Sequence, residues 1–165
     1  MNTVRAFAAP AHETKLCDPA ALVDRLADLP RPIVFTNGVF DLLHRGHVTY
    51  LAQARAQGNS LVVALNSDAS ARRLGKGPDR PLNTLADRAA VIAALAATSL
   101  VTWFEQDTPA DLIEQIQPDV LVKGGDWPLD RIVGAQGVLA RGGKVLSIPF
   151  DHQTSTTALV ERIRR

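Results

Sequence analysis

Five short, mainly apolar runs constrain the fold of this chain more than any other feature of its sequence. They occupy residues 33–36, 61–65, 100–104, 119–123 and 145–148. Continuous apolar runs of this length, without alternation of apolar and polar residues, are typical of strands buried on both faces of a parallel sheet. Because helical segments separate the runs, we expect an α/β fold with a Rossmann-like, doubly wound, five-stranded parallel sheet in a single domain.

Capping and helix-breaking residues mark the segments between these strands. Asp18-Pro19 can start a helix that Pro30 ends, and Thr84 can cap another. Further helices are expected at 48–56, after Thr108-Pro109, at 135–140, and from Thr154 or Ser155 onward. The first residues show no clear periodicity. We therefore expect a flexible N-terminal leader over residues 1–17 and one domain over residues 18–165.

Charge and cysteine content exclude several classes of protein. The 165 residues contain 18 Lys and Arg against 17 Asp and Glu, so no overall charge favours nucleic acid or an anionic membrane surface. The single Cys17 excludes an internal disulfide framework and a thiolate-rich zinc site. No apolar run is long enough to span a bilayer or to act as a signal peptide. We expect a cytoplasmic protein without nucleic-acid or membrane partners.

A segment with two glycines and two histidines follows the first strand. It reads Gly38-Val39-Phe40-Asp41-Leu42-Leu43-His44-Arg45-Gly46-His47. Gly38 allows a sharp turn after the strand, and Gly46 removes a side chain between the histidines where a helix begins. A helix start presents free N–H groups and a partial positive charge, and His44 and His47 project from one face of it. The segment therefore predicts a phosphate site.

Two other interpretations of His44 and His47 are possible, namely helix capping and metal binding. Histidines at a helix start can simply cap the helix and remain solvated. With Asp41 they could form a metal site, but zinc usually needs a third strong ligand in a closed shell, so we rank metal well below phosphate and expect no metal ligands. Phe40 and Asp41 are expected to be structural, as a ring packed under the loop and as a carboxylate that orients the backbone or the helix start.

Polar or glycine-containing segments also follow other strands, at the edge of the sheet where ligands bind in doubly wound folds. They are Asn66-Ser67-Asp68, Lys123-Gly124-Gly125-Asp126-Trp127 and Ser155-Thr156-Thr157. Asp126 could accept hydrogen bonds from ribose, Lys123 could bind phosphate or acceptor, and the three hydroxyls could bind phosphate, although capping explains one of them.

Three basic residues on loops or helices are further candidates. Lys76 and Arg80 lie in the breaker-rich segment 75–81, where they are either ordinary solvated residues or cations that close over bound substrates, and we favour closure. Arg88 lies on a helix and could pair with Asp87 or with another carboxylate.

In order and spacing these segments resemble the small nucleotidyltransferases with an HxGH signature, which His44-Arg45-Gly46-His47 matches. Residues 36–41, 66–68, 105–109, 118–127 and 155–157 are similar to those of D-glycero-β-D-manno-heptose 1-phosphate adenylyltransferases. That family often occurs joined to a sugar kinase, for which this chain has no room, so the stand-alone form is expected. Two departures are Asp87-Arg88 in place of the usual Glu-Arg, and Gln153-Thr154 where related cytidylyltransferases often have a glycine.

The resemblance implies transfer of AMP from ATP to the anomeric phosphate of a heptose, with Mg²⁺ as cofactor and ADP-heptose for lipopolysaccharide as product. The partners are then ATP and a sugar 1-phosphate, and a homodimer is possible because symmetric dimers are the commonest oligomers. Two alternatives stay open: another small nucleotidyltransferase, such as a glycerol-3-phosphate cytidylyltransferase, or a nucleotide-sensing module without chemistry.

The same resemblance implies roles for particular residues. His44, His47 and Lys76 are the expected catalytic residues, and Asn66, Asp68 and Arg80 are expected to bind the acceptor. The expected nucleotide-binding residues are Asn37, Gly38, Val39, Phe40, His44, His47, Lys123, Gly124, Asp126, Ser155, Thr156 and Thr157.

Overall fold

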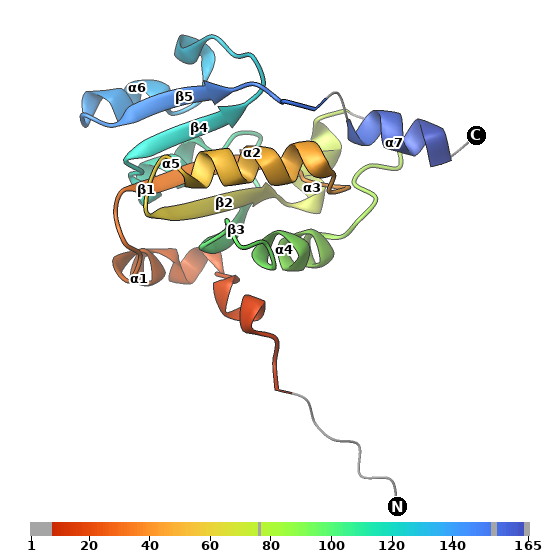
Figure 1. Cartoon of the computed structure of the whole chain (residues 1–165), viewed down its shortest axis with the longest axis horizontal. Helices are drawn as coiled ribbons and strands as arrows, with labels where there is room; N and C mark the ends of the chain where they lie inside the picture. Colours follow the sequence, from red (N-terminus) through yellow and green to blue (C-terminus); the bar gives the residue numbers. More distant parts are fainter. Residues whose placement is uncertain (1–7, 76, 153–154, 164–165) are drawn as a thin grey trace, which may run out of the picture.

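The structure, a computed structural model, describes residues 8–75, 77–152 and 155–163. Its centre is a five-stranded parallel sheet in the order β3-β2-β1-β4-β5 (Figure 1). The strands are β1 (Ile33–Gly38), β2 (Ser60–Asn66), β3 (Leu100–Phe104), β4 (Val120–Gly124) and β5 (Lys144–Ile148). The predicted doubly wound α/β fold is confirmed, with strand bounds close to the apolar runs of the sequence.

The sheet is buried on both faces, as the apolar runs predict. Along β1, Ile33 and Phe35 enter one hydrophobic cluster and Val34 enters the other. One cluster includes side chains of α1 (Leu22–Ala27), α5 (Ala110–Ile116) and α6 (Ala135–Ala140), and the other includes those of α2 (Arg45–Arg55) and α4 (Leu85–Ala93). Helices therefore cover both faces of the sheet, which leaves its carboxyl edge for ligands.

The winding of the chain reverses between β1 and β4. From β1 the chain proceeds through α2 to β2 and then to β3, and it returns past β1 to form β4 and β5. In doubly wound sheets, ligands bind outside the carboxyl ends of the strands at such a reversal. Asn37 and Gly38 end β1, and Lys123 and Gly124 end β4. These four residues therefore border the expected crevice.

Helix starts follow the predicted capping residues with one difference in position. Thr84 caps α4, because its hydroxyl oxygen accepts a hydrogen bond from the Asp87 amide at 3.3 Å. Helix α2 starts at Arg45 and not at residue 48, with His44 as its N-cap residue. The earlier start places both histidines at the first turn of the helix.

Two short helices lie near the carboxyl edge of the sheet. Helix α3 (Asp68–Arg73), which the sequence analysis does not predict, starts after Ser67, whose hydroxyl accepts from the Ser70 amide at 3.1 Å. Helix α7 (Thr156–Ile163) projects from the body of the domain and has no buried residue (Figure 1). Single turns of 3-10 helix occur at Pro19–Ala21 and Leu129–Arg131.

The packed part of the chain begins before the predicted boundary at residue 17. A 3-10 helix covers Ala11–Lys15, and Leu16 forms a parallel bridge with Val101 of β3. The Cys17 amide donates to the Val101 carbonyl at 2.9 Å, and Cys17 is 2% exposed. Strand β3 lies at one edge of the sheet, and this segment pairs with that edge. Residues 11–17 are thus joined to the domain that the sequence places at 18–165. Pairing over two residues leaves no periodic pattern, so the sequence gives no sign of this contact. Residues 1–7 lie outside the described ranges.

Within the described residues, no helix combines the length and the apolar character that crossing a membrane requires.

Candidate active site

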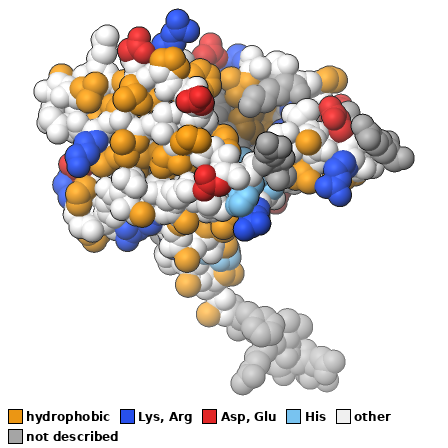
Figure 2. Space-filling view, turned by 45° about the horizontal axis from the view of Figure 1, so that its top comes forward, with side chains coloured by type: hydrophobic (Ala, Val, Ile, Leu, Met, Phe, Trp, Pro, Cys, Tyr) orange, Lys and Arg blue, Asp and Glu red, His pale blue; other side chains and the backbone are white. Residues whose placement is uncertain are grey.

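A cavity of about 410 Å³ lies at the carboxyl ends of β1 and β4. The described residues that line it are Asn37, Gly38, Val39, Phe40, Asp41, His44, His47, Tyr50, Arg80, Lys123, Gly124, Trp127, Phe150, Ser155, Thr156 and Thr157. On the face drawn in Figure 2, histidine side chains reach the surface between the body of the domain and the C-terminal part of the chain. The topological reversal therefore coincides with a cavity that holds both histidines of the HxGH segment.

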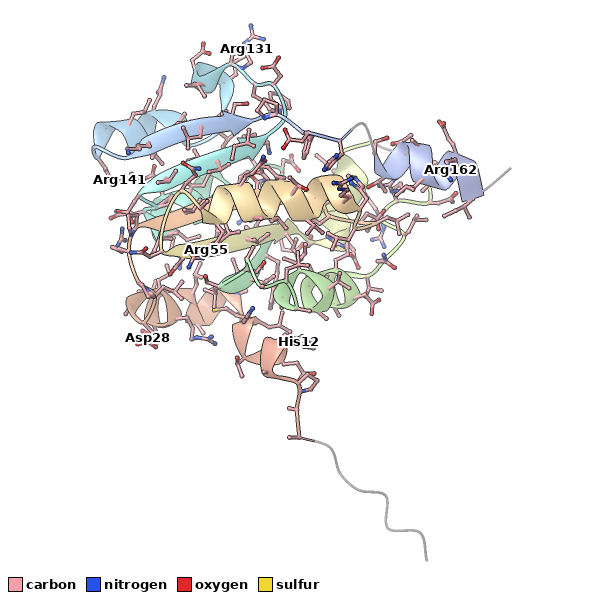
Figure 3. The ribbon with its side chains drawn as sticks, in the orientation of Figure 1. His12, Asp28, Arg55, Arg131, Arg141 and Arg162 are labelled. Carbon is pink, nitrogen blue, oxygen red and sulfur yellow. The ribbon has the colours of Figure 1, made fainter. Side chains whose placement is uncertain are left out.

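A second cavity, of about 470 Å³, lies at the opposite edge of the sheet. Its lining includes Arg31, Asp119, Arg141 and Lys144 and contains none of the residues predicted for the site. Figure 3 shows Arg141 at the other end of the molecule from Arg162 of α7. Size alone would favour this cavity, but the chemistry of the lining residues places the candidate active site at the carboxyl edge.

His44 and His47 form a stacked pair at the start of α2. Their ring centroids lie 3.8 Å apart, with an angle of 24° between the planes. Gly46 permits this arrangement, because a Cβ there would stand 3.1 Å from two atoms of the His44 ring. His44 is the N-cap residue, yet its side chain makes no capping hydrogen bond. Capping therefore does not explain where the His44 ring lies.

Two phenylalanine rings stand edge-on to the histidine pair. The Phe40 and His47 centroids are 5.2 Å apart, and those of Phe150 and His47 are 6.5 Å apart. The Nδ1 atom of His44 is buried and has no hydrogen-bond partner among the described residues. Burial disfavours the charged imidazolium and lowers the pKa of His44 below its usual value of 6.5. Burial therefore favours the neutral form of the His44 ring in the free protein.

Phe40 shapes the loop between β1 and α2. Its φ angle is 48°, in the left-handed region, and its ring is buried against Gly38. A Cβ at position 38 would stand 2.9 Å from Phe40 Cε2, so the close approach requires glycine. The ring packs under the loop, as the sequence indicates.

The ends of β4 and β1 face each other across the reversal. Lys123 Nζ donates to Asn37 Oδ1 at 3.4 Å, which places a cation beside the first strand end. At the next residue, a Cβ on Gly124 would stand 2.7 Å from Phe150 Cζ and 3.2 Å from Tyr50 Cε2. The absence of a side chain at Gly124 thus lets Phe150 pack directly on the strand end and form a wall of the cavity.

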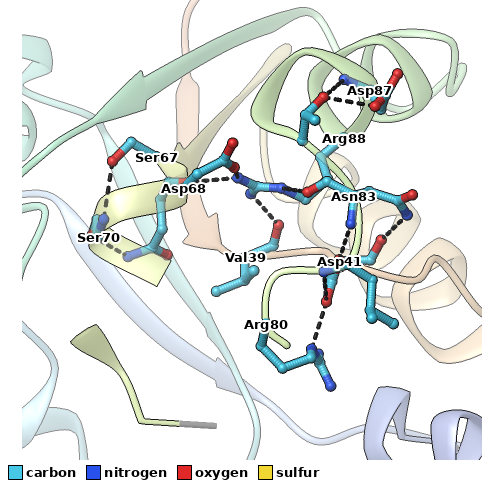
Figure 4. Close-up of polar contacts among 12 residues, drawn as sticks. Val39, Asp41, Ser67, Asp68, Ser70, Arg80, Asn83, Asp87 and Arg88 are labelled. Carbon is cyan, nitrogen blue, oxygen red and sulfur yellow. Dashed lines mark hydrogen bonds and ion pairs between the residues drawn. The ribbon is translucent and has the colours of Figure 1, made fainter. Parts of the chain in front are cut away.

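Asp41 connects the histidine loop to the segment before α4 (Figure 4). Its carboxylate accepts hydrogen bonds from the Leu82 and Asn83 amides at 2.8 to 2.9 Å and from Arg80 Nε at 2.6 Å. Burial alone would raise the pKa of Asp41, but the amides of Asn83 and Leu82 and the Arg80 guanidinium outweigh it and hold the pKa below its ordinary value. Asp41 therefore orients the backbone, as the sequence indicates, and fixes Arg80 at the cavity wall.

Arg88 joins the ends of β1 and β2 from inside the fold (Figure 4). Its side chain is fully buried. Nη1 donates to the Val39 carbonyl at 2.7 Å, and Nη2 donates to the Asn66 carbonyl at 2.9 Å and to Asp68 Oδ1 at 2.7 Å. The sequence leaves open whether Arg88 pairs with Asp87 or with another carboxylate; the structure gives Asp68 as the partner.

The structure brings most of the predicted site residues to the cavity and leaves several outside its lining. Those that line it are Asn37, Gly38, Val39, Phe40, His44, His47, Arg80, Lys123, Gly124, Ser155, Thr156 and Thr157. Asn66 and Asp68 do not; the Asn66 amide donates to Ser70 Oγ at 3.0 Å, and Asp68 pairs as described. Asp126 is exposed and does not line the cavity. Lys76 lies outside the described residues.

Three aromatic residues that the sequence analysis does not predict as site residues form part of the cavity wall. Tyr50 lies three residues after His47 on α2, a spacing that puts both on one helix face. Phe150 follows β5 and is 46% exposed, and Trp127 follows β4 and is 50% exposed. The Trp127 indole donates to the Gly124 carbonyl at 3.1 Å. Helix spacing could have indicated Tyr50, whereas Phe150 meets the site only through the tertiary fold.

Comparison with known proteins agrees with this geometry. The sequence is 55% identical over 155 residues to the D-beta-D-heptose 1-phosphate adenylyltransferase of Bordetella bronchiseptica, covering 93% of this chain and 96% of that protein. It is 59% identical over 133 residues to the bifunctional protein HldE of Azotobacter vinelandii, covering 81% of this chain but 28% of the longer protein.

Solved structures extend the likeness to the fold. The lipopolysaccharide core biosynthesis protein of Thermoplasma volcanium superposes with a TM-score of 0.59 at 26% identity, over 74% of this chain and 98% of the other. A pantoate-beta-alanine ligase of Francisella tularensis superposes with a TM-score of 0.58 at 12% identity, over 84% of this chain and 67% of the other, and shares the fold alone. The sequence pattern of the cytidylyltransferase-like family matches residues 35–162, and the chain belongs to this family of nucleotidyltransferases.

Proposed function

We propose that this protein transfers AMP from ATP to D-glycero-β-D-manno-heptose 1-phosphate, giving ADP-heptose and pyrophosphate for lipopolysaccharide core synthesis. The observation that carries the proposal is the stacked His44 and His47 pair at the start of α2, in a chain 55% identical to a heptose 1-phosphate adenylyltransferase along nearly the whole length of both proteins. We further infer a cytoplasmic location, where ATP is available, and a homodimer.

The cavity suits a direct, in-line transfer. The acceptor phosphate is already a nucleophile at neutral pH, so the reaction needs alignment and charge stabilisation more than a general base. His44 and His47 would donate hydrogen bonds to phosphate oxygens that gain charge in the transition state, and Lys123 would add a cation from the opposite strand end. The first turn of α2 would contribute its partial positive charge.

Magnesium is proposed as part of the nucleotide substrate. Asp41 is the one carboxylate among the described lining residues. Its oxygens already accept hydrogen bonds from two backbone amides and from Arg80. Among the described residues, no group of three His, Cys, Asp or Glu side chains could hold a metal ion. The chemistry of these donors therefore favours Mg²⁺ that arrives on the phosphate oxygens of ATP.

Acceptor binding is proposed for the side of the cavity next to the segment before α4. Arg80 lines this wall and is held there by Asp41 at 2.6 Å, so it offers an oriented cation to the sugar phosphate. Lys76 precedes Arg80 by four residues, and we propose that it adds charge from the same loop. Asn66 and Asp68 would act through Arg88, which binds both of them.

Pyrophosphate release separates this proposal from its alternatives. The purified protein is assayed with ATP or CTP, each against heptose 1-phosphate and glycerol 3-phosphate, in the presence of Mg²⁺. We expect turnover with ATP and heptose 1-phosphate. Turnover that requires CTP would favour a cytidylyltransferase, and nucleotide binding without turnover on any acceptor would favour a sensing module.

A further inference from the structure

His44 and His47 stand too close to gain and lose protons independently. Their ring centroids are 3.8 Å apart and the rings are nearly parallel, with 24° between them. Two imidazolium rings in this arrangement would place like charges in contact at a partly buried site, so the second proton binds less readily than the first. In the free protein, the stacking therefore disfavours a second positive charge on the pair.

The charged groups among the described lining residues offer this pair no uncommitted opposite charge. Asp41 is the sole carboxylate among the described lining residues, and Arg80 and two amides already bind it. Lys123 of β4, a further cation, lines the same cavity. Tyr50 of α2 has its hydroxyl bound to Thr36 Oγ1 at 2.6 Å, and burial raises its pKa.

Two more titratable groups approach from the segment after β5, and one lies beside the pair on α2. The His152 carbonyl oxygen would stand 3.7 Å from a Cβ on Gly46, which brings that segment next to the pair. The Asp151 carboxylate accepts a hydrogen bond from Gln53 Nε2 at 2.7 Å. Arg45 is exposed at the helix start. The described surroundings thus supply no uncommitted anion that lines the cavity.

We propose that the nucleotide itself charges His44: the ring is neutral in the free protein, and entry of a triphosphate brings a proton from solvent onto its free ring nitrogen. The anionic oxygens supply an opposite charge that the described lining residues do not offer to the ring, so they stabilise its protonated form. No covalent bond forms or breaks apart from the bond to this proton. The inference deepens the proposed function, on which it rests in taking ATP as the natural triphosphate.

This arrangement gives the protein a cationic donor only when phosphate is in place. Because binding and protonation are linked, affinity for a triphosphate rises as the pH falls toward the range in which His44 is charged in the free protein. The buried Nδ1 atom of His44 has no partner among the described residues, so the described part of the protein does not itself satisfy that ring nitrogen.

NMR titration of the four histidines tests the coupling without any nucleotide. His44 is assigned by comparison with His44→Gln, and its ring signals are followed against pH with and without inorganic tripolyphosphate, in the absence of metal. We expect His44 to stay neutral at pH 7 alone and to charge at a clearly higher pH with tripolyphosphate bound. Binding of tripolyphosphate that leaves the titration of His44 unchanged would overturn the proposal, as would a His44 ring already charged at pH 7.

Calorimetry with the magnesium complex of α,β-methylene-ATP measures the same proton during nucleotide binding. Titrations at one pH in buffers of different ionisation enthalpy should give uptake of about one proton per bound analogue for the wild type and close to none for His44→Gln. The control is His12→Gln, which lies on the N-terminal 3-10 helix far from α7 and should match the wild type (Figure 3).

The outcomes of calorimetry and of the turnover assay are distinguishable. If the observed enthalpy of analogue binding does not depend on the ionisation enthalpy of the buffer, no proton is taken up. That result would contradict the charging of His44, even if AMP transfer proceeds. Proton uptake in a protein that transfers no AMP would instead overturn the proposed function and leave the charging of His44 standing.

Discussion

Arg88 and Asp41 hold the backbone of Asn83 from its two sides. Arg88 Nε donates to the Asn83 carbonyl at 3.1 Å, and the Asp41 carboxylate accepts from the Asn83 amide at 2.9 Å. Arg88 reaches this position from α4, whereas Asp41 belongs to the histidine loop. Asp41 thus holds both Arg80 and Asn83 against the loop that leads into the histidine pair at the start of α2.

Replacing Arg88 should destabilise the whole domain. Arg88→Met would leave three backbone carbonyls and Asp68 without their donor, and we expect the free energy of unfolding to fall by about 3 kcal/mol. Urea denaturation measures the change. The matched control is Arg72→Met at an exposed site on α3, which should stay within about 0.5 kcal/mol of the wild type. An Arg88→Met protein as stable as this control would refute the structural role of the network.

Asp41 should make stability depend on acidity. Its pKa is lowered in the folded protein, so the stabilisation is complete well above the ordinary carboxyl value of 3.8 and is lost as the pH falls through the folded value. Unfolding free energies measured from pH 7 down to acid should show that loss in the wild type. Asp41→Asn should be less stable at pH 7 and should lose less on acidification.

The control for Asp41 is Asp24→Asn, at an exposed site on α1. It should keep the wild-type dependence on pH. If Asp41→Asn kept that dependence as well, the carboxylate would not be the source of the effect.

Gly46→Ala separates the position of the His44 ring from the stability of α2. A Cβ there would stand 3.1 Å from the His44 ring and displace it by a few tenths of an ångström, so we expect kcat to fall about tenfold. Alanine also favours the helix by up to about 1 kcal/mol, so thermal stability should hold or rise. Val48→Ala, at an exposed position of the same helix, should gain stability without loss of kcat. Equal kcat values for the two variants would show that the stack is not needed.

Lys76→Ala tests the loop that the sequence predicts to close over the substrates. We expect kcat to fall at least tenfold while the melting temperature stays near that of the wild type, because the lost charge would act on bound phosphate and not on packing. Lys144→Ala, at an exposed position at the opposite edge of the sheet, is the control and should change neither quantity. Reduced stability with full specific activity would show a structural role for Lys76.

Local patterns in the sequence suffice to predict the sheet and to pick out many residues of the cavity lining. The strands are continuous apolar runs, so residues that are neighbours in the sequence are enough to predict that the strands are buried. Because the strands are parallel, their carboxyl ends lie at one edge of the sheet and bring His44 and Lys123 to one cavity. Apolar periodicity does not predict helix α3, because its six residues have no apolar face, although Ser67 is a recognisable N-cap.

Contacts between distant segments could not be predicted in the same way. The choice of Asp68 over Asp87 as the partner of Arg88, and the seating of Phe150 on Gly124, depend on which segments the fold places side by side. The spacing of residues along the chain does not predict these contacts. The pairing of Leu16 with β3 cannot be predicted from the sequence for the same reason.

Single-turnover adenylyl transfer by His47→Asn tests the central claim most directly, namely that the stacked histidines stabilise the transition state. Wild type, His47→Asn and the control His12→Asn are mixed with ATP, Mg²⁺ and heptose 1-phosphate at enzyme excess, and the dissociation constant for ATP is measured separately. We expect the rate of His47→Asn to fall by about 10² to 10³ while the dissociation constant changes by less than about fivefold. An unchanged rate, or a loss that lies entirely in ATP binding, would contradict that claim.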